Sequence, residues 1–202
     1  ARRLREHGVN EATPDALLEQ AERAYFANQR TEATERLDEL LSLEPHQPHA
    51  LYLKANCLKE EGKVDQALRL SGMALAVDPA NWRLHRLRGS LLWDSGRPEA
   101  ALEAYDRALA RHPVDAYTWY YKGYVLYRLQ RYEEALPCLD RALSLKSDSP
   151  YIYNQKAFCL ERLDRHTEAA ACYRRSLRLN AGDLFTREYL GQALQAAGQL
   201  DE

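Results

Sequence analysis

The sequence lacks a long apolar run, and this absence limits the class of protein it can encode. No stretch of 18 consecutive apolar residues occurs among its 202 residues, so no segment is expected to span a bilayer. The first residues, Ala1 to His7, lack the apolar core of a secretory signal peptide. Charge is nearly balanced, with 28 Lys and Arg against 30 Asp and Glu, so no single-sign field attracts nucleic acid or a membrane surface. We therefore expect no nucleic-acid partner and no membrane insertion.

Cysteine is scarce and lacks the spacing of a metal or redox site. The four cysteines are Cys57, Cys138, Cys159 and Cys172, and none belongs to a C-x-x-C pair. Cys138 and Cys172 occupy the same place in successive copies of a repeat, so they should lie one helix layer, roughly 8–10 Å, apart. A disulfide needs Cα atoms within about 7 Å. We expect four reduced thiols in small packing sites, as in a cytoplasmic protein.

Signatures of catalysis are missing as well. The sequence has no glycine-rich phosphate loop, no G-x-S-x-G and no H-E-x-x-H. Its six histidines are scattered: His46 and His49 lack a third ligand at a fixed spacing, and His85 falls at a packing position. The sequence therefore predicts a protein that is not an enzyme, with no metal and no cofactor.

A strict 34-residue repeat is the main positive feature of the chain. Six copies align without insertion or deletion, with Ala or Gly as the eighth residue of each and Ala as the twentieth residue of each complete copy. A fixed period in this range indicates a solenoid of stacked units. We expect one solenoid domain, preceded by an N-terminal cap or remnant at residues 1–13. The copies cover residues 14–47, 48–81, 82–115, 116–149, 150–183 and, incomplete, 184–202.

Each copy predicts two helices joined by a short turn. In the fourth copy, Trp119, Gly123 and Leu126 follow the i, i+4, i+7 spacing of one helix face. The turn follows at Gln130, a place that Gly holds in three other copies because Gly ends a helix without steric cost. At the boundaries between copies, proline should end one helix, and Asn, Asp, Ser or the initial Thr13 should cap the next. The boundary residues are Gln47, Asn81, Asp115, Ser149 and Asp183.

These copies resemble the units of the tetratricopeptide repeat family. That family places a bulky residue, a Gly or Ala, a Tyr or Leu and a later Ala at fixed positions, where the fourth copy has Trp119, Gly123, Leu126 and Ala135. The resemblance runs from residue 14 to the end of the chain, and the first copy departs most from the pattern. The third copy carries Gly89, Leu92, Gly96, Ala101, Tyr105, Ala108 and Pro113, with His85 where Trp is usual.

The resemblance implies an all-α fold, a right-handed superhelical α-solenoid of helix-turn-helix repeats. Its concave surface would be lined by the first helix of each copy, and the segment would make less than one full turn. The small residues at positions 8 and 20, such as Gly123 and Ala101, should lie where the two helices of a copy cross closely.

Tyrosine gathers at the positions expected to face that concave groove. Positions 2, 5, 9 and 12 of each first helix form a stripe, and the chain has 13 Tyr but only three Phe. Tyrosine offers a large rigid contact area and a hydroxyl, and arginine can pair with a carboxylate. We therefore predict a peptide-binding groove in which Arg83, Arg86 and Arg128 select an acidic group. The predicted groove residues are Tyr52, Asn56, Arg83, Arg86, Trp93, Tyr117, Tyr120, Tyr124, Tyr127, Arg128, Tyr151, Asn154 and Phe158.

A second interpretation of the same tyrosines is that they pack laterally between successive first helices. The two interpretations can hold for different residues of the stripe.

The sequence can be compared directly with one ligand class of the family. Family members that bind acidic chaperone tails use Lys at position 5 and Asn at position 9 of one copy. Here Asn56 is the only match at position 9, and its copy has Tyr52 at position 5. The sequence therefore predicts no chaperone-tail clamp, and it has no asparagine ladder.

The predicted function is a non-catalytic scaffold that binds a peptide or helical segment of a partner protein. One alternative is a substrate-docking or regulatory arm of a larger enzyme whose catalytic domain lies outside this chain. Another is self-association through the exposed helix face of the incomplete sixth copy.

Overall fold

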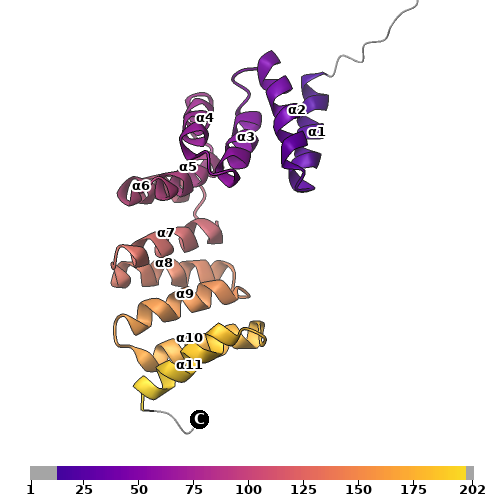
Figure 1. Ribbon diagram of the computed structural model, residues 1–202. Helices are drawn as coiled ribbons and strands as arrows, with labels where there is room; N and C mark the ends of the chain where they lie inside the picture. The colour runs from indigo at the N-terminus through magenta and orange to yellow at the C-terminus, as the bar shows by residue number, and fades with distance from the viewer. Residues whose placement is uncertain (1–12, 199–202) are drawn as a thin grey trace, which may run out of the picture. The chain divides into compact units, whose positions relative to one another are not determined.

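The computed structural model describes residues 13–198, which are entirely helical apart from short turns (Figure 1). Eleven α-helices follow one another in this part of the chain, in antiparallel pairs of a first and a second helix, so the predicted all-α solenoid class is confirmed. The pairs are α1 (Pro14–Phe26) with α2 (Arg30–Leu43), α3 (Pro48–Glu60) with α4 (Val64–Val77), α5 (Trp82–Asp94) with α6 (Pro98–Arg111), α7 (Ala116–Arg128) with α8 (Tyr132–Leu145), and α9 (Pro150–Glu161) with α10 (His166–Leu179), while α11 (Leu184–Ala196) is a first helix.

The residues before the first helices cap them in all but one case. Thr13, Gln47, Asn81, Asp115 and Asp183 each accept a hydrogen bond from a backbone N–H in the first turn of the following helix. The prediction was wrong for one residue, because the side chain of Ser149 makes no cap bond with α9. The first turn of α9 is also loose, since the Tyr153 N–H lies 3.4 Å from the Ser149 carbonyl.

The turns between paired helices share one backbone conformation. The predicted glycines Gly62, Gly96 and Gly198 have φ of 74°, 74° and 71°. Gln130, at the same place in the fourth copy, adopts φ 61° although it carries a side chain. In each complete copy the turn is closed by an i→i+5 backbone bond, such as that from the Arg131 N–H to the Leu126 carbonyl. Asn28 and Asp164 complete the set of left-handed turn residues.

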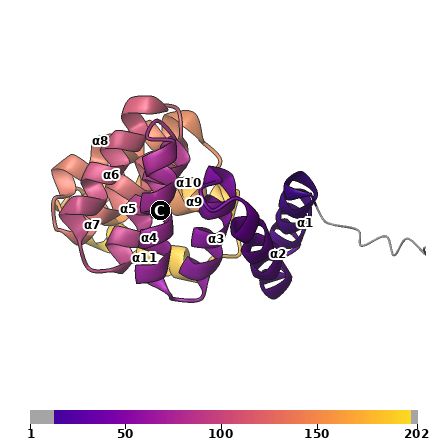
Figure 2. The same cartoon turned by 90° about the horizontal axis from the view of Figure 1, so that it is seen from above.

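Helices α1–α4 and helices α5–α11 form two compact units, divided after Pro79. In the first unit, Leu17, Leu37 and Leu53 form a buried core between the helices. In the second unit each second helix packs against the next first helix, so α7 to α11 follow one another as layers (Figure 1). When the molecule is seen from above, along the direction in which these helices are stacked, the helices of this unit overlap in projection (Figure 2).

Close helix crossings explain the small residues at positions 8 and 20 in copies whose two helices are both described, as predicted. A Cβ added at Gly89 would lie 2.6 Å from the ring of Tyr105, and one added at Gly123 would lie 2.9 Å from Leu139. The alanines at position 20 are completely buried, with no exposed surface. They are Ala33, Ala67, Ala101, Ala135 and Ala169.

A lysine–aspartate pair joins successive layers at three places. In the second unit, the Lys122 ammonium lies 2.5 Å from Asp106, and Lys156 lies 2.5 Å from Asp140. Lys54 and Asp38 make the same pair between α3 and α2 in the first unit. Each pair is 16 residues apart in sequence and fixes the register of a first helix on the preceding second helix.

All four cysteines are free thiols, as expected. Cys57, Cys138 and Cys159 are buried, and Cys172 is partly exposed. Burial raises the pKa of each thiol, and for Cys159 it raises the pKa to about 12. These cysteines therefore act as small packing residues and are poor nucleophiles at neutral pH.

Candidate peptide-binding surface

The predicted groove residues are divided between the two units. Tyr52 and Asn56 lie on α3 in the first unit, and the other eleven lie on α5, α7 and α9 in the second. Tyr52 is half-buried against the core of the first unit and stacks on His49, with ring centroids 6.1 Å apart. The Asn56 amide donates to the backbone carbonyl of Tyr52 at 2.8 Å. His49 pairs with Glu22 through its Nε2, at 2.7 Å, so it is a surface partner of a carboxylate.

Two stripe tyrosines of α7 pack laterally against neighbouring helices. The ring of Tyr124 meets Trp93 of α5 edge-on at 5.6 Å, and the Arg128 guanidinium lies over both rings. Arg128 also donates a hydrogen bond to the Tyr124 hydroxyl at 2.9 Å. Tyr127 contacts Phe158 of α9 at 6.4 Å between ring centroids. The packing interpretation therefore describes the C-terminal half of the α7 stripe, where aromatic contacts join α5, α7 and α9.

Phe158 also belongs to an aromatic cluster at the end of the second unit. Its ring meets Tyr189 of α11 at 5.1 Å and Tyr173 of α10 at 5.9 Å, both edge-on. The Tyr173 hydroxyl donates to the Glu161 carboxylate at 2.7 Å. Burial and the adjacent Glu161 carboxylate raise the pKa of Tyr173. This cluster fixes α11 on the preceding helix pair.

The position-5 residues of two copies contact the start of the next first helix. Arg86 donates to Asp115 at 3.1 Å, and Asp115 also accepts from the backbone N–H and the hydroxyl of Thr118. One guanidinium N–H of the predicted acid-selecting Arg86 is thus already engaged within the chain. Arg83, by contrast, is exposed and lies over the ring of Trp82 at 4.7 Å.

The same arrangement recurs two copies later. Asn154 donates to the Thr186 hydroxyl at 2.6 Å, and Thr186 in turn donates to Asp183. These hydrogen bonds lower the pKa of Asp183. This role of Asp and Thr was not predicted, although the pattern D-x-x-T occurs at both repeat boundaries in the same register.

The tyrosines at the start of α7 and α9 remain exposed and line a small cavity. Tyr117 is 50% exposed and Tyr151 is 75% exposed, whereas Tyr120 is half-buried and its pKa is raised by burial. The Lys146 ammonium lies over the Tyr117 ring, 4.7 Å from its centroid, and donates to its hydroxyl at 2.8 Å. The cavity has a volume of about 220 Å³ and is lined by Tyr117, Tyr120, Tyr121, Ser149, Tyr151 and Ile152. Three predicted groove residues thus come together there.

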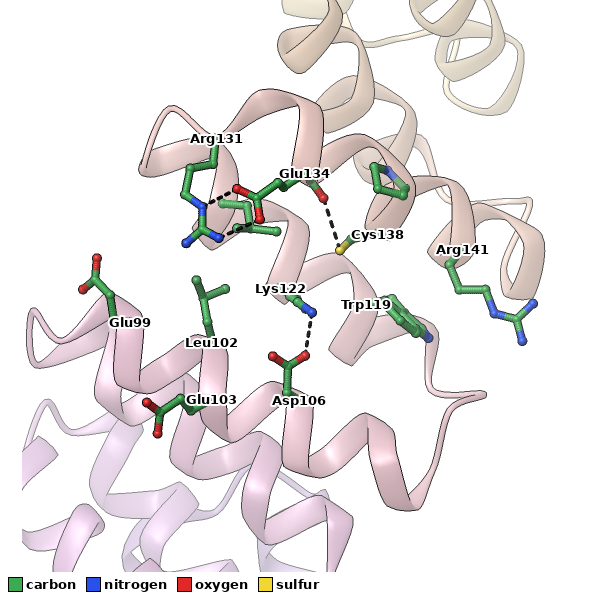
Figure 3. A pocket seen from close by; sticks show the side chains of 12 residues that line it. Glu99, Leu102, Glu103, Asp106, Trp119, Lys122, Arg131, Glu134, Cys138 and Arg141 are labelled. Atoms are coloured by element: carbon green, nitrogen blue, oxygen red, sulfur yellow. Dashed lines mark hydrogen bonds and ion pairs between the residues drawn. The ribbon is translucent and has the colours of Figure 1, made fainter.

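A larger pocket of about 800 Å³ lies between α6, α7 and α8 (Figure 3). Lys122 donates to Asp106 at 2.5 Å inside it, and Arg131 binds Glu134 through two hydrogen bonds of 2.7 and 2.6 Å. Four of its charged side chains thus already pair with one another. None of the predicted groove residues lines this pocket. Its walls are Glu99, Leu102, Glu103, Asp106, Trp119, Lys122, Leu126, Arg131, Glu134, Pro137, Cys138 and Arg141.

Neither a metal site nor a membrane span is found within residues 13–198. No three His, Cys, Asp or Glu side chains in that range are grouped as metal ligands would be. None of the helices there combines the length and apolar character that crossing a bilayer requires.

Comparison with known proteins identifies the repeat. The family described as "Tetratricopeptide repeat" matches residues 86–150 and 132–183, and a second family of that description matches residues 26–91. No curated protein sequence matches the chain.

Solved structures share the fold at low sequence identity. "MamA 41-end from Desulfovibrio magneticus RS-1" aligns with a TM-score of 0.75 and 20% identity, over 85% of this chain and 97% of that one. The crystal structure of TTC0263, described as a thermophilic TPR protein in Thermus thermophilus, aligns with a TM-score of 0.70 and 24% identity, over 91% of this chain and 100% of that one. At this identity the similarity establishes the fold alone.

Proposed function

Because this chain belongs to the tetratricopeptide repeat family, which generally serves as a non-catalytic protein-interaction scaffold, we propose that it binds a peptide segment of a partner protein on the first-helix surface of its second unit. The observation that carries this proposal is the exposure of Tyr117 and Tyr151 beside one cavity. Large aromatic rings left in water at one place are typical of a recognition site, because burying them in a partner releases that surface from water.

The cationic groups beside the site favour a partner segment that carries an acidic group. Lys146 donates a hydrogen bond to Tyr117, which lines the cavity, and Arg83 is exposed one copy earlier on the same surface. We propose that Arg86 and Arg128 hold successive copies together. Arg86 donates to Asp115 of the next copy, and the Arg128 guanidinium lies over the Trp93 ring of the preceding copy. A docking arm of a larger enzyme would use the same surface. The four free cysteines support a location in the reducing cytoplasm.

A displayed peptide library selected on the immobilised chain tests this function. The affinity of a recovered peptide is then measured by fluorescence anisotropy for the wild type and for the double variant Tyr117→Ala, Tyr151→Ala. We expect the double variant to bind about 30-fold more weakly, which corresponds to ~2 kcal/mol, while its helicity is unchanged.

Phe26→Ala is the matched control for the peptide experiment. Phe26 is an aromatic residue with 79% exposure on α1, outside the proposed surface. Its substitution should leave peptide affinity unchanged. Equal binding by the wild type and the double variant would exclude this surface as the site.

Self-association is a second candidate because α11 exposes two large apolar side chains. Leu184 and Phe185 are 69% and 75% exposed. Sedimentation velocity over a range of concentrations would show association by the wild type that Phe185→Ser abolishes. A monomer at every concentration would rule this candidate out.

A further inference from the structure

We propose that the cavity lined by Tyr117, Tyr120, Tyr121 and Tyr151 binds the pyrrolidine ring of a proline in an extended segment of the partner. This inference rests on the proposed function and specifies the chemistry of one subsite. The cavity opens between α7 and the start of α9, where Ile152 is buried beneath the tyrosines.

The size of the cavity limits the kind of group that can enter. Its volume of about 220 Å³ holds roughly seven water molecules at ~30 Å³ each. An α-helix is about 10–12 Å wide with its side chains, so a whole helix cannot enter this space. One compact ring with the backbone next to it does fit. The subsite therefore takes a single side chain from a segment that passes over it.

The charges at the cavity disfavour a cationic occupant. Aromatic rings often surround ammonium groups, and a carboxylate commonly completes such cages. No Asp or Glu is among the residues that line this cavity, and the Lys146 ammonium already lies over the Tyr117 ring at 4.7 Å. The Lys146 ammonium would repel a second cation bound in the cavity. A neutral group is the occupant that these charges accept.

Free hydroxyl groups around the rings supply the polar half of the recognition. Across residues 13–198, no hydrogen bond engages the hydroxyls of Tyr120, Tyr121 or Tyr151, and the Ser149 hydroxyl does not cap α9. These groups are available to donate to backbone carbonyls. A polyproline II segment has no internal hydrogen bonds, so its carbonyls are free to accept them.

Proline also brings a low entropic cost to the complex. Its ring fixes φ, so a proline-containing segment is already extended before it binds, and aromatic grooves recognise such segments in several domain families. The tyrosine rings supply flat apolar walls for the pyrrolidine ring, and the hydroxyls supply hydrogen bonds at the rim. The size of the cavity, its charge and its free hydroxyl groups thus all suit a proline ring.

The direct test titrates the whole chain, with ¹³C-labelled tyrosine rings, with N-acetyl-proline methylamide and follows the NMR signals. We expect saturable shifts at Tyr117, Tyr120 and Tyr151 and no change at Tyr25 or Tyr173, which lie elsewhere. N-acetyl-glycine methylamide has the same backbone groups without the ring and should bind about tenfold more weakly. No saturable shift at the three tyrosines, or equal binding of the glycine compound, overturns the proposal.

Variants and a cationic probe sharpen this result. Tyr151→Ala should abolish the proline shifts while circular dichroism is unchanged, and Phe26→Ala should preserve the shifts. If Tyr151→Ala reduces helicity, Tyr151→Leu, which keeps the apolar bulk but removes the flat ring, is used in its place. Tetramethylammonium chloride should give no saturable shift. Binding of tetramethylammonium at the three tyrosines would identify a cation cage instead and overturn the proposal.

The peptide library separates failure of this inference from failure of the proposed function. Library peptides that bind through Tyr117 and Tyr151 but show no enrichment in proline would reject the proline subsite and leave the peptide-binding function standing. If the chain selects no peptide while N-acetyl-proline methylamide still titrates the three tyrosines, the subsite stands and the general peptide-binding function fails.

Discussion

Arg86 of α5 donates a hydrogen bond to Asp115, the capping residue of α7, across 3.1 Å. The contact joins α5 and α7, the first helices of two successive copies. The Asp115 side chain also accepts a hydrogen bond from the backbone N–H of Thr118 in α7. The side chains are 26% and 10% exposed, so water screens the pair less than it screens the ion pairs on the outer surface. Loss of either partner should therefore affect stability, and loss of Asp115 should affect it more.

Asp115→Ala should destabilise the protein by about 2–3 kcal/mol, because it removes a helix cap and leaves Arg86 unpaired. Arg86→Met should cost less, about 1 kcal/mol, since Thr118 still bonds the carboxylate. Urea unfolding followed by circular dichroism measures both values. Arg83→Met, at an exposed position one turn away, is the control and should change stability by less than about 0.5 kcal/mol. Equal losses for all three variants would contradict the proposed role of the pair.

Gln130→Gly should stabilise the protein by about 0.5–1 kcal/mol. Gln130 adopts φ 61°, a conformation that carries a steric cost for residues with a Cβ and almost none for glycine. The reciprocal change, Gly96→Ala at φ 74°, should destabilise by about 1 kcal/mol, although no atom lies within 4 Å of the added Cβ. Thermal unfolding of both variants, compared with the wild type, would show midpoints that move in opposite directions.

Gly89→Ala should destabilise the protein by about 1–3 kcal/mol, because its Cβ would lie 2.6 Å from the Tyr105 ring and force that ring to move. Gly191→Ala is the matched control at the same repeat position. No atom lies within 4 Å of a Cβ there, so the higher helix propensity of alanine should stabilise α11 by up to about 1 kcal/mol. A similar change in urea midpoint for both variants would argue against close packing at Gly89.

Stability should fall as the pH rises above about 8.5, where an unfolded cysteine thiol ionises. Burial raises the pKa of Cys159 to about 12, so between these values the unfolded chain releases a proton that the folded chain keeps. Below about pH 8.5 both states hold the proton and this effect vanishes. The loss approaches ~1.4 kcal/mol per pH unit for one thiol.

Urea unfolding in reductant at pH 7.5, 8.5 and 9.5 measures this pH dependence. In the Cys159→Ala variant, the free energy of unfolding should fall less steeply with rising pH than in the wild type. The variant should also be less stable than the wild type at pH 7.5. The other three thiols, whose pKa values are raised by burial as well, should keep a part of the slope. An unchanged slope in Cys159→Ala would mean that this thiol is not the titrating group.

The helices could be predicted from the sequence because their signals are local and recur with the period. Pro48 and Trp82 begin their copies and also begin α3 and α5, since the preceding residue caps the helix. The close crossing at Gly89 followed from the small residue alone. Ser149 was the exception: a residue type that favours capping predicts the bond but does not ensure its geometry.

The fate of each stripe tyrosine could not be predicted from its position in the copy. Tyr124 packs because position 12 of the preceding copy is Trp93, whereas Tyr151 makes no ring stacking contact within residues 13–198 and is 75% exposed. The contact of Arg86 with Asp115 likewise joins residues 29 apart. Such contacts depend on pairs of residues in different copies, and one copy carries no information about its neighbour's side chains.

The uniform left-handed turn has a consequence for the length of the chain. Each complete copy closes its own turn through an i→i+5 backbone hydrogen bond, such as that from the Lys63 N–H to the Leu58 carbonyl. Both bonded groups belong to the same copy. Duplicating or deleting one 34-residue copy inside the second unit would thus leave every turn chemically intact. The proposed recognition surface could therefore be lengthened or shortened by whole copies, while each copy keeps the same turn.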